Sequence, residues 1–291
     1  MKKGKLKYIV LSIIFLLFTE NFGNSHHVLL DNTNICHDIS IWGDLLNILE
    51  SHNVVVRDVR GEGWTNLMNM DMVWIQCPQR FYSNEIKTRL QNFCRSGGKI
   101  LIGEAYITSY SCINDLLSTP GWQTTMQIVP YTEHSAYPLR WWISISPFTD
   151  DVSAVYGLGP VPGRIDCGQN AYPFAFCEPR FVWSVVAISY PFLYENNCDG
   201  FIVLILGTHG WEVSLPSPRS VGMYDVDDYQ FASNILLCLA GVPGYEIEPC
   251  AIPSDTIRPV WPNCYPNPFT PNSDGMNDHC QFLFEGRGYK P

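Results

Sequence analysis

The chain has 291 residues, of which 46% are hydrophobic and 16% are charged, and its net charge is −10. This apolar content is enough for a sizeable core and excludes a largely disordered chain. Because contact with phosphates requires a basic surface, the negative charge argues against nucleic acid as a partner.

Residues 1–25 have the layout of a secretory signal peptide. Four lysines precede an apolar run from Tyr8 to Phe18, and Gly23-Asn24-Ser25 supplies small residues for cleavage. The apolar run is short for a membrane span, although an uncleaved N-terminal anchor is the alternative. We therefore expect an exported protein, secreted or at the cell surface, with no membrane span after signal cleavage.

All 11 cysteines follow the predicted cleavage site. In an exported protein this number favours disulfides, and an odd count leaves at least one cysteine outside an internal pair. Cys167–Cys177 and Cys250–Cys264 are plausible local bridges, but sequence alone does not fix the connectivity. No C-x-x-C pair occurs, which argues against a tetrathiolate zinc site or a thioredoxin-type redox pair.

Strands and helices alternate in the first part of the chain. We expect strands at residues 27–30, 54–59, 72–75 and 99–102, and later at 201–206. A first helix is expected to begin near Asp38, with Ile41, Leu45, Ile48 and Leu49 on one face. Ser83 should cap a second helix with Ile86, Leu90, Phe93 and Cys94 on one face, and Asp227 or Asp228 a last helix that Gly241 ends.

This alternation predicts an α/β fold in which helices cover both faces of a parallel sheet. Residues 127–191 are rich in aromatic and β-branched residues with many Gly and Pro, so we expect an insertion of short antiparallel strands there. After Gly244 the chain becomes Pro-rich, and residues 245–262 are predicted to form a stiff linker.

Four segments carry a resemblance to a known family: VLLDN, RLQNFCRSGGKILIGEAY, GFIVLILGTHGW and FASNILLCLAG. In this pattern, residues 26–244 resemble the class I glutamine amidotransferase-like superfamily, and more narrowly its non-catalytic secreted and intraflagellar-transport-type members. The resemblance implies a flavodoxin-like domain. The long insertion departs from the family pattern.

An active amidotransferase requires a nucleophilic cysteine in a G-x-C-x-G elbow. The resemblance places this elbow at the end of the fourth strand, where the chain has Gly103-Glu104-Ala105-Tyr106. A G-x-S-x-G elbow is also absent from the sequence. The missing nucleophile favours a protein that is not an enzyme.

A replacement site is still conceivable where the parallel strands end, because ligands bind there in open α/β sheets. The candidate residues on this rim are Asn32, Cys36, His37, Cys77, Glu104 and His209. Cys77 and His209 could form a thiol–imidazole pair, and Cys36, His37 and Cys77 could hold a metal. A Cys36–Cys77 disulfide is the simpler alternative and would abolish both.

Residues 267–278, NPFTPNSDGMND, resemble the opening of Ig-like C-terminal domains of bacterial surface proteins, including those with gliding-motility or type IX sorting tails. Ser273 and Met276 stand where the family usually has Gly and Ile. A β-sandwich needs roughly 80–100 residues, so residues 263–291 are expected to be the start of an incomplete module.

The same loop is a candidate calcium site, because closely spaced carboxylate and amide oxygens around a glycine suit this cation. Its candidate ligands are Asn272, Asp274, Asn277 and Asp278. The loop lacks the full pattern of an EF-hand, and an Asx-turn is the alternative. We expect no other cofactor.

Together these features predict a non-catalytic binding or scaffold protein that is secreted or at the cell surface. Its C-terminal module would serve sorting or anchoring, and its partner would be a protein or glycan at the cell surface. The alternative is an extracellular hydrolase acting on an amide or glycan, with Cys77, His209 and Glu104 as the residues to test. A third alternative is an accessory domain of a larger enzyme.

Overall fold

The computed structural model describes residues 25–31, 33, 42–104, 107–130, 141–142, 145–152, 163–176, 184–195, 197–208, 228–248 and 250. An eight-stranded sheet organises the domain, with the strand order β2-β1-β3-β4-β10-β9-β8-β6. The first five strands of this order are parallel, and β9, β8 and β6 continue the sheet in antiparallel orientation.

The strands of this sheet are β1 (His26–Asp31), β2 (Val54–Asp58), β3 (Met72–Gln76), β4 (Lys99–Glu104), β6 (Trp141–Trp142), β8 (Ala171–Phe176), β9 (Ser184–Ser189) and β10 (Ile202–Leu206). A small separate sheet pairs β5 (Met126–Pro130) with β7 (Gly163–Cys167) in antiparallel orientation. The helices are α2 (Gly43–Ser51), α3 (Val59–Glu62), α4 (Asn84–Arg95), α5 (Tyr110–Leu117) and α6 (Asp228–Leu239). Short 3-10 turns are η2 (Leu67–Asn69), η3 (Ile107–Ser109) and η4 (Leu193–Glu195).

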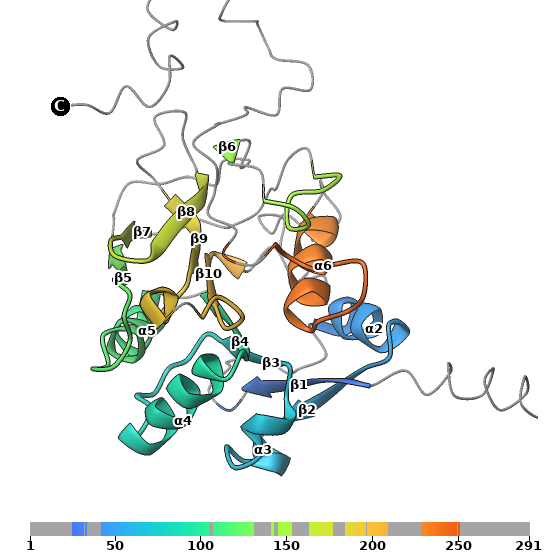
Figure 1. Cartoon of the computed structure of the whole chain (residues 1–291), viewed down its shortest axis with the longest axis horizontal. Coiled ribbons are helices and arrows are strands. Elements are labelled where there is room, and N and C mark those ends of the chain that lie inside the picture. The colour runs from blue at the N-terminus through green and yellow to red at the C-terminus, as the bar shows by residue number, and fades with distance from the viewer. Residues whose placement is uncertain are drawn as a thin grey trace, which may run out of the picture.

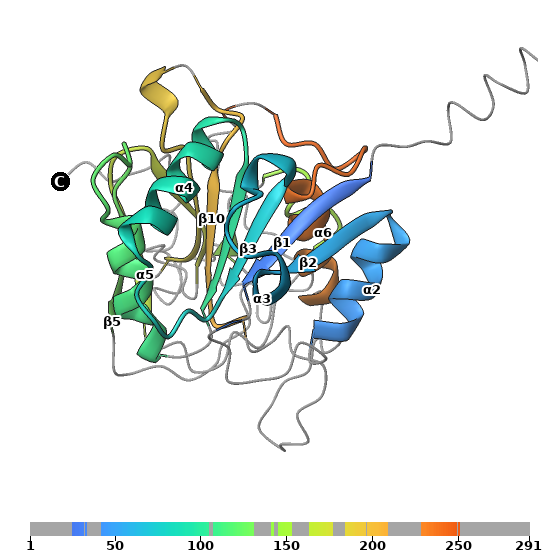
Figure 2. The same cartoon turned by 90° about the horizontal axis from the view of Figure 1, so that it is seen from below.

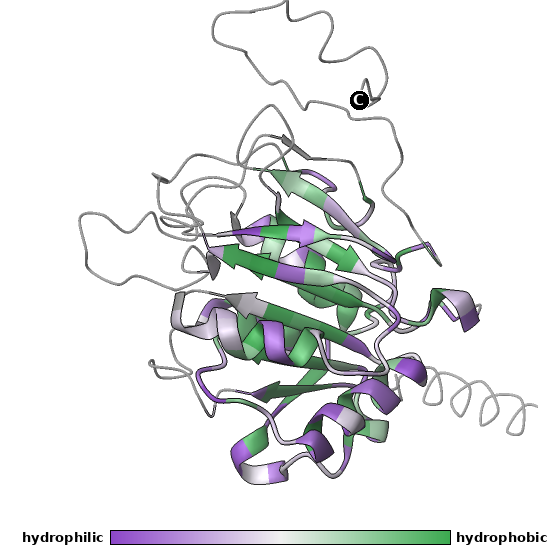
Figure 3. Ribbon diagram, turned by 90° about the vertical axis from the view of Figure 1, so that its left-hand side faces the viewer, coloured by the Kyte–Doolittle hydropathy of each residue, from purple (hydrophilic) through white to green (hydrophobic). Residues whose placement is uncertain are grey.

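The parallel strands confirm the predicted flavodoxin-like sheet. When only these five strands are numbered along the chain, their order in the sheet is 2-1-3-4-5. Helices α2 and α6 cover one face, and α3, α4 and α5 lie on the other (Figure 1, Figure 2). The strands of the sheet are predominantly apolar along their length (Figure 3). Every residue of β3, β9 and β10 is buried, as expected for strands covered on both faces.

The helix boundaries show where local sequence signals decide the structure. Ser83 caps α4 as predicted, because its Oγ accepts a hydrogen bond from the Ile86 backbone amide at 3.3 Å. The predicted cap of the first helix near Asp38 lies outside the described residues, and α2 begins at Gly43 after Trp42 without a side-chain cap. Trp42 is buried against Trp74, so packing determines this helix start.

The predicted insertion contains antiparallel strands, but most of them extend the main sheet. Strand β9 pairs with β10, and β8 pairs with β9, so the inserted strands lengthen the sheet beyond its parallel part. Helix α5 was not predicted from the sequence. Asn114 in α5 holds β5 in place, because its side chain both donates to and accepts from the backbone of Ile128.

The cysteine pairing differs from both predicted bridges. Cys250 forms a disulfide with Cys198, 52 residues away, so the predicted Cys250–Cys264 bridge is wrong. Cys167 is a free thiol, so the Cys167–Cys177 bridge is wrong as well. Cys94, Cys112 and Cys238 are buried free thiols that fill the core as small apolar side chains. Local spacing failed here because the actual pair joins two segments that only the fold brings together.

Several predicted features fall outside the described residues. They include the signal peptide, the Ig-like module and its calcium ligands Asn272, Asp274, Asn277 and Asp278. Among the helices that the structure describes, none is long and apolar enough to cross a membrane.

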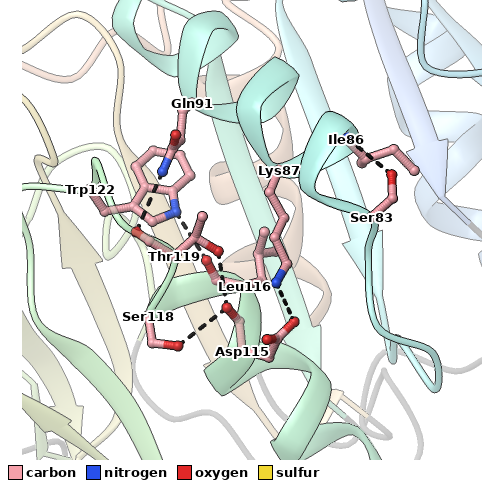
Figure 4. Close-up of polar contacts among 9 residues, drawn as sticks. All are labelled: Ser83, Ile86, Lys87, Gln91, Asp115, Leu116, Ser118, Thr119 and Trp122. Carbon is pink, nitrogen blue, oxygen red and sulfur yellow. Dashed lines mark hydrogen bonds and ion pairs between the residues drawn. The ribbon is translucent and has the colours of Figure 1, made fainter.

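An ion pair joins α4 to α5 (Figure 4). Lys87 Nζ lies 2.6 Å from Asp115 Oδ2, and the Lys87 side chain is only 9% exposed. Gln91, one turn further along α4, donates a hydrogen bond to the Pro120 carbonyl at 3.0 Å. The two helices are therefore held together by polar contacts at the boundary of the core.

We expect Asp115→Ala to lower the free energy of unfolding by about 2 kcal/mol, because it leaves the Lys87 ammonium nearly buried without its counter-charge. The exposed Glu85–Arg89 pair on the same helix is a matched control. Glu85→Ala should change stability by less than about 0.5 kcal/mol. Urea unfolding followed by circular dichroism measures both, and equal losses would contradict a special role for Lys87.

Candidate functional site

The carboxyl ends of the parallel strands meet at one edge of the sheet, which we call the rim. In the sheet, β2 lies on one side of β1, whereas β3, β4 and β10 follow one another on its other side. The reversal of strand order therefore lies between β1 and β3, where open α/β sheets form their ligand crevice. The last residues of these two strands, Asp31 and Gln76, lie at this position.

Asp31 carries a buried carboxylate that accepts hydrogen bonds from neutral donors. Its Oδ1 accepts hydrogen bonds from the Thr33 backbone amide at 3.0 Å and the Thr33 hydroxyl at 2.5 Å. Its Oδ2 accepts from the Tyr82 hydroxyl at 2.5 Å. Asp31 is 2% exposed and makes no ion pair with a basic side chain in the described part of the chain. Three donors therefore replace the water that the carboxylate loses.

Tyr82 comes from the connection between β3 and α4. Its ring packs edge-on against Trp64, with centroids 5.6 Å apart. Burial raises the pKa of Tyr82 well above its usual value, and the nearby charge and hydrogen bond of Asp31 raise it further. Tyr82 is thus a neutral donor at physiological pH and not a candidate phenolate nucleophile.

Gln76 points to the opposite face of the sheet from Asp31, because Asp31 is in register with Ile75 and side chains alternate along a strand. The Gln76 Oε1 accepts a hydrogen bond from Trp74 Nε1 at 3.1 Å, and its Nε2 donates to Thr208 Oγ1 at 2.7 Å. Thr208 follows β10, two strands away. The Gln76 side chain therefore crosses β4 to reach it.

Gly103 makes this crossing possible. It is in register with Gln76 on one side and with Ile205 of β10 on the other. A Cβ at position 103 would lie 2.2 Å from Gln76 Oε1. A side chain there would displace the amide, so the close approach requires glycine.

Cys77 directly follows Gln76, and its backbone has a positive φ of 44°. Its amide donates to the Gly103 carbonyl at 2.8 Å, and its side chain is 1% exposed. Positive φ is uncommon for a residue with a side chain, and Pro78 restricts this position further. The surrounding sheet thus holds the chain in a conformation that cysteine does not favour.

The structure places only part of the predicted rim. Cys77 is buried beside β4, and Glu104 is the last residue of β4, with its side chain outside the described residues. Asn32, Cys36, His37 and His209 also lie outside them. The Cys77–His209 pair, the Cys36–Cys77 disulfide and a metal on Cys36, His37 and Cys77 therefore stay predictions. Among the described side chains, no group of three or more His, Cys, Asp or Glu could hold a metal ion.

Sequence reasoning missed the residues that organise this rim: Asp31, Gln76, Tyr82 and Thr208. One signal was available, because Asp31 and Gln76 are polar residues that end otherwise apolar strands. A polar side chain at that position is buried between covering layers and needs partners. The partners themselves are distant in sequence, and Gln76 and Thr208 are 132 residues apart.

No protein-family model matches the chain. The search of curated proteins found no match. Among solved structures, one described as the mmIFT52 N-terminal domain is similar with a TM-score of 0.53 and 12% identity, covering 73% of this chain and 97% of that chain.

A glutamine amidotransferase from Thermotoga maritima matches with a TM-score of 0.42 and 10% identity, covering 63% and 75% of the two chains. An exo-beta-1,4-mannosidase from Opitutaceae bacterium strain TAV5 matches with a TM-score of 0.41 and 14% identity, covering 69% of this chain and 34% of the enzyme. At 12% identity, the similarity to the mmIFT52 N-terminal domain is one of fold.

We expect Gly103→Ala to lower the free energy of unfolding by about 1–3 kcal/mol, because its methyl group would collide with the Gln76 amide. In a Gln76→Ala background the same change should cost much less, since the colliding group is gone. Gly61→Ala is the control, because a Cβ there meets nothing within 4 Å. Chemical unfolding of the four variants gives the coupling, and strictly additive losses would contradict the crossing geometry.

Tyr82→Phe should cost about 1.5–3 kcal/mol at pH 7, because Asp31 loses one of its donors while it stays buried. Since the folded-state pKa of Tyr82 is raised, its contribution is complete below the unfolded value of about 10 and is lost as the pH rises above it. The variant should therefore lose stability less steeply than the wild type above pH 10.

The exposed Tyr194 provides the control for this titration. Tyr194→Phe should leave both the stability at pH 7 and its alkaline slope nearly unchanged. Unfolding measured from pH 7 to pH 11 tests the set, and parallel curves for wild type and Tyr82→Phe would contradict the assignment.

Proposed function

We propose that this chain is a non-catalytic binding or scaffold domain of an exported protein. The observation that carries the proposal is the structure at the end of β4. There Gly103 is covered by the Gln76 amide, and the strand continues regularly to Glu104. A G-x-C-x-G nucleophile would occupy this place in an active amidotransferase, and this chain has no cysteine there.

The chemistry of the described rim supports the same role. Gln76 and Thr208 are neutral at all relevant pH values, and they bond to each other. Tyr82 is held neutral, and its proton is directed to Asp31. Groups paired in this way stabilise the ends of β1 and β3 and leave no described nucleophile–base pair.

Export and anchoring come from the two ends of the sequence. The predicted signal peptide at residues 1–25 supports passage out of the cytoplasm, and residues 267–278 support a C-terminal sorting or anchoring module. The finer assignment to a non-catalytic, secreted branch of the amidotransferase-like superfamily belongs to this proposal. A protein or glycan at the cell surface is the partner that fits this setting.

One observation favours the alternative, an extracellular hydrolase of amides or glycans. Cys77 has a strained backbone at the rim, and such positions are enriched at active sites. In that mechanism Cys77 would be the nucleophile, His209 its base and Glu104 the residue that orients the base. The burial of Cys77 favours the binding role, because attack on an extracellular substrate requires an accessible thiolate.

A test of this choice uses the full chain, exported with its own leader. We expect iodoacetamide at pH 7 to modify Cys77 no faster than Cys112, another buried thiol, and we expect no glutamine hydrolysis above background. Peptide mass spectrometry and an ammonia-release assay give the two readouts. Rapid modification of Cys77, together with hydrolysis that Cys77→Ser abolishes, would overturn the binding role in favour of the hydrolase.

A further inference from the structure

A covalently held segment crosses the end of the sheet opposite the rim. We call residues 242–248 with Cys250 the strap. It follows α6, runs along the end of the sheet where β1 begins, and approaches the connection that precedes β10 (Figure 2). Its far end is fixed by the disulfide between Cys250 and Cys198.

Apart from this disulfide, the strap makes few contacts within the part of the chain that the structure describes. Tyr245 packs edge-on against His52, with ring centroids 6.0 Å apart, and Tyr245 and Ile247 are partly buried against the core. Its hydrogen bonds within the described residues are mostly local, such as Gly244 N to Glu246 Oε2 at 2.9 Å, and the Ile247 backbone also hydrogen-bonds to the Cys238 thiol. A segment with so few distant contacts opens at a low free-energy cost unless a covalent bond restricts it.

The strap covers a thiol. Cys238 lies in the last turn of α6 and is 1% exposed, and Lys99 Nζ donates to its carbonyl at 3.3 Å. Burial raises the pKa of the Cys238 thiol to about 12, against the opposing effects of Lys99 and the Ile247 backbone amide, while Glu246 of the strap raises it further. Ile247 and Glu246 therefore lie close to this thiol.

The disulfide is more accessible than the thiol beneath it. Cys198 and Cys250 are both partly exposed, whereas Cys238 is buried. Thiol–disulfide exchange requires that the attacking thiolate reach a sulfur of the bridge. A soluble reductant can thus meet Cys198–Cys250 before it meets the core.

We propose that the Cys198–Cys250 disulfide is a redox-controlled latch, whose reduction releases the strap and exposes the Cys238 thiol. A dithiol reductant supplies the two electrons. One of its thiolates attacks a bridge sulfur, the S–S bond breaks, and a mixed disulfide forms. The second thiolate of the reductant then attacks the reductant's own sulfur in the mixed disulfide and releases the second protein thiolate. The products are two protein thiols and the oxidised, cyclic reductant.

The experiment uses the full chain, once oxidised and once treated with dithiothreitol that is then removed without air. Each sample is alkylated with N-ethylmaleimide under native conditions, and labelling of each cysteine is followed by peptide mass spectrometry. Reduction should raise the labelling rate of Cys238 by roughly tenfold or more, because local opening then exposes it. Cys112 is the matched control, since it is a buried thiol of α5 on the other face of the sheet.

In a Cys198→Ala/Cys250→Ala double variant, N-ethylmaleimide should label Cys238 at the faster rate without any reductant. Hydrogen exchange should show loss of protection in the strap while β1, β3 and β4 stay protected. The latch is overturned if Cys238 remains as unreactive after reduction as before. It is also overturned if Cys112 becomes reactive together with Cys238, because the whole domain would then have opened.

Discussion

The Gln76 side chain is the contact on which the rim of this domain depends. It crosses β4 above Gly103, accepts from Trp74 and donates to Thr208 beyond β10. One buried amide thereby links β3 to the residues after β10 across the intervening β4, in addition to the backbone ladder of these strands. Since an unpaired buried amide is costly, each of these partners constrains the others.

The other face of the same edge is fixed by Asp31 and Tyr82. Together with the Gln76 contacts, this pair determines how the chain leaves β1 and β3, the two strands between which the strand order reverses. The site where related folds bind ligands is therefore built here from rigid, hydrogen-bonded groups. Under the proposed binding role, these buried groups would hold the surrounding rim in a preformed shape, which reduces the entropy lost on binding.

Much of the fold could be predicted from the sequence, because apolar runs such as the one before Asp31 and the cap at Ser83 are local signals. The alternation of strands and helices predicted a parallel sheet covered on both faces, and the resemblance to a known family implied its flavodoxin-like arrangement. The Cys198–Cys250 disulfide and the Gln76–Thr208 bond were not predictable, since each joins segments that are far apart in sequence. The sequence indicated that Cys77 and Glu104 lie on the rim, but it did not indicate the hydrogen bonds of Gln76 beside them.

A crystal structure of the protein tests the central claim most directly, since the claim concerns which groups meet at the ends of β3, β4 and β10. The account predicts that the Gln76 amide lies over Gly103 and bonds to Thr208, and that the Cys77 thiol is closed to solvent. A Cys77 thiol within hydrogen-bond reach of the His209 ring, open to solvent, would contradict it and identify a catalytic pair.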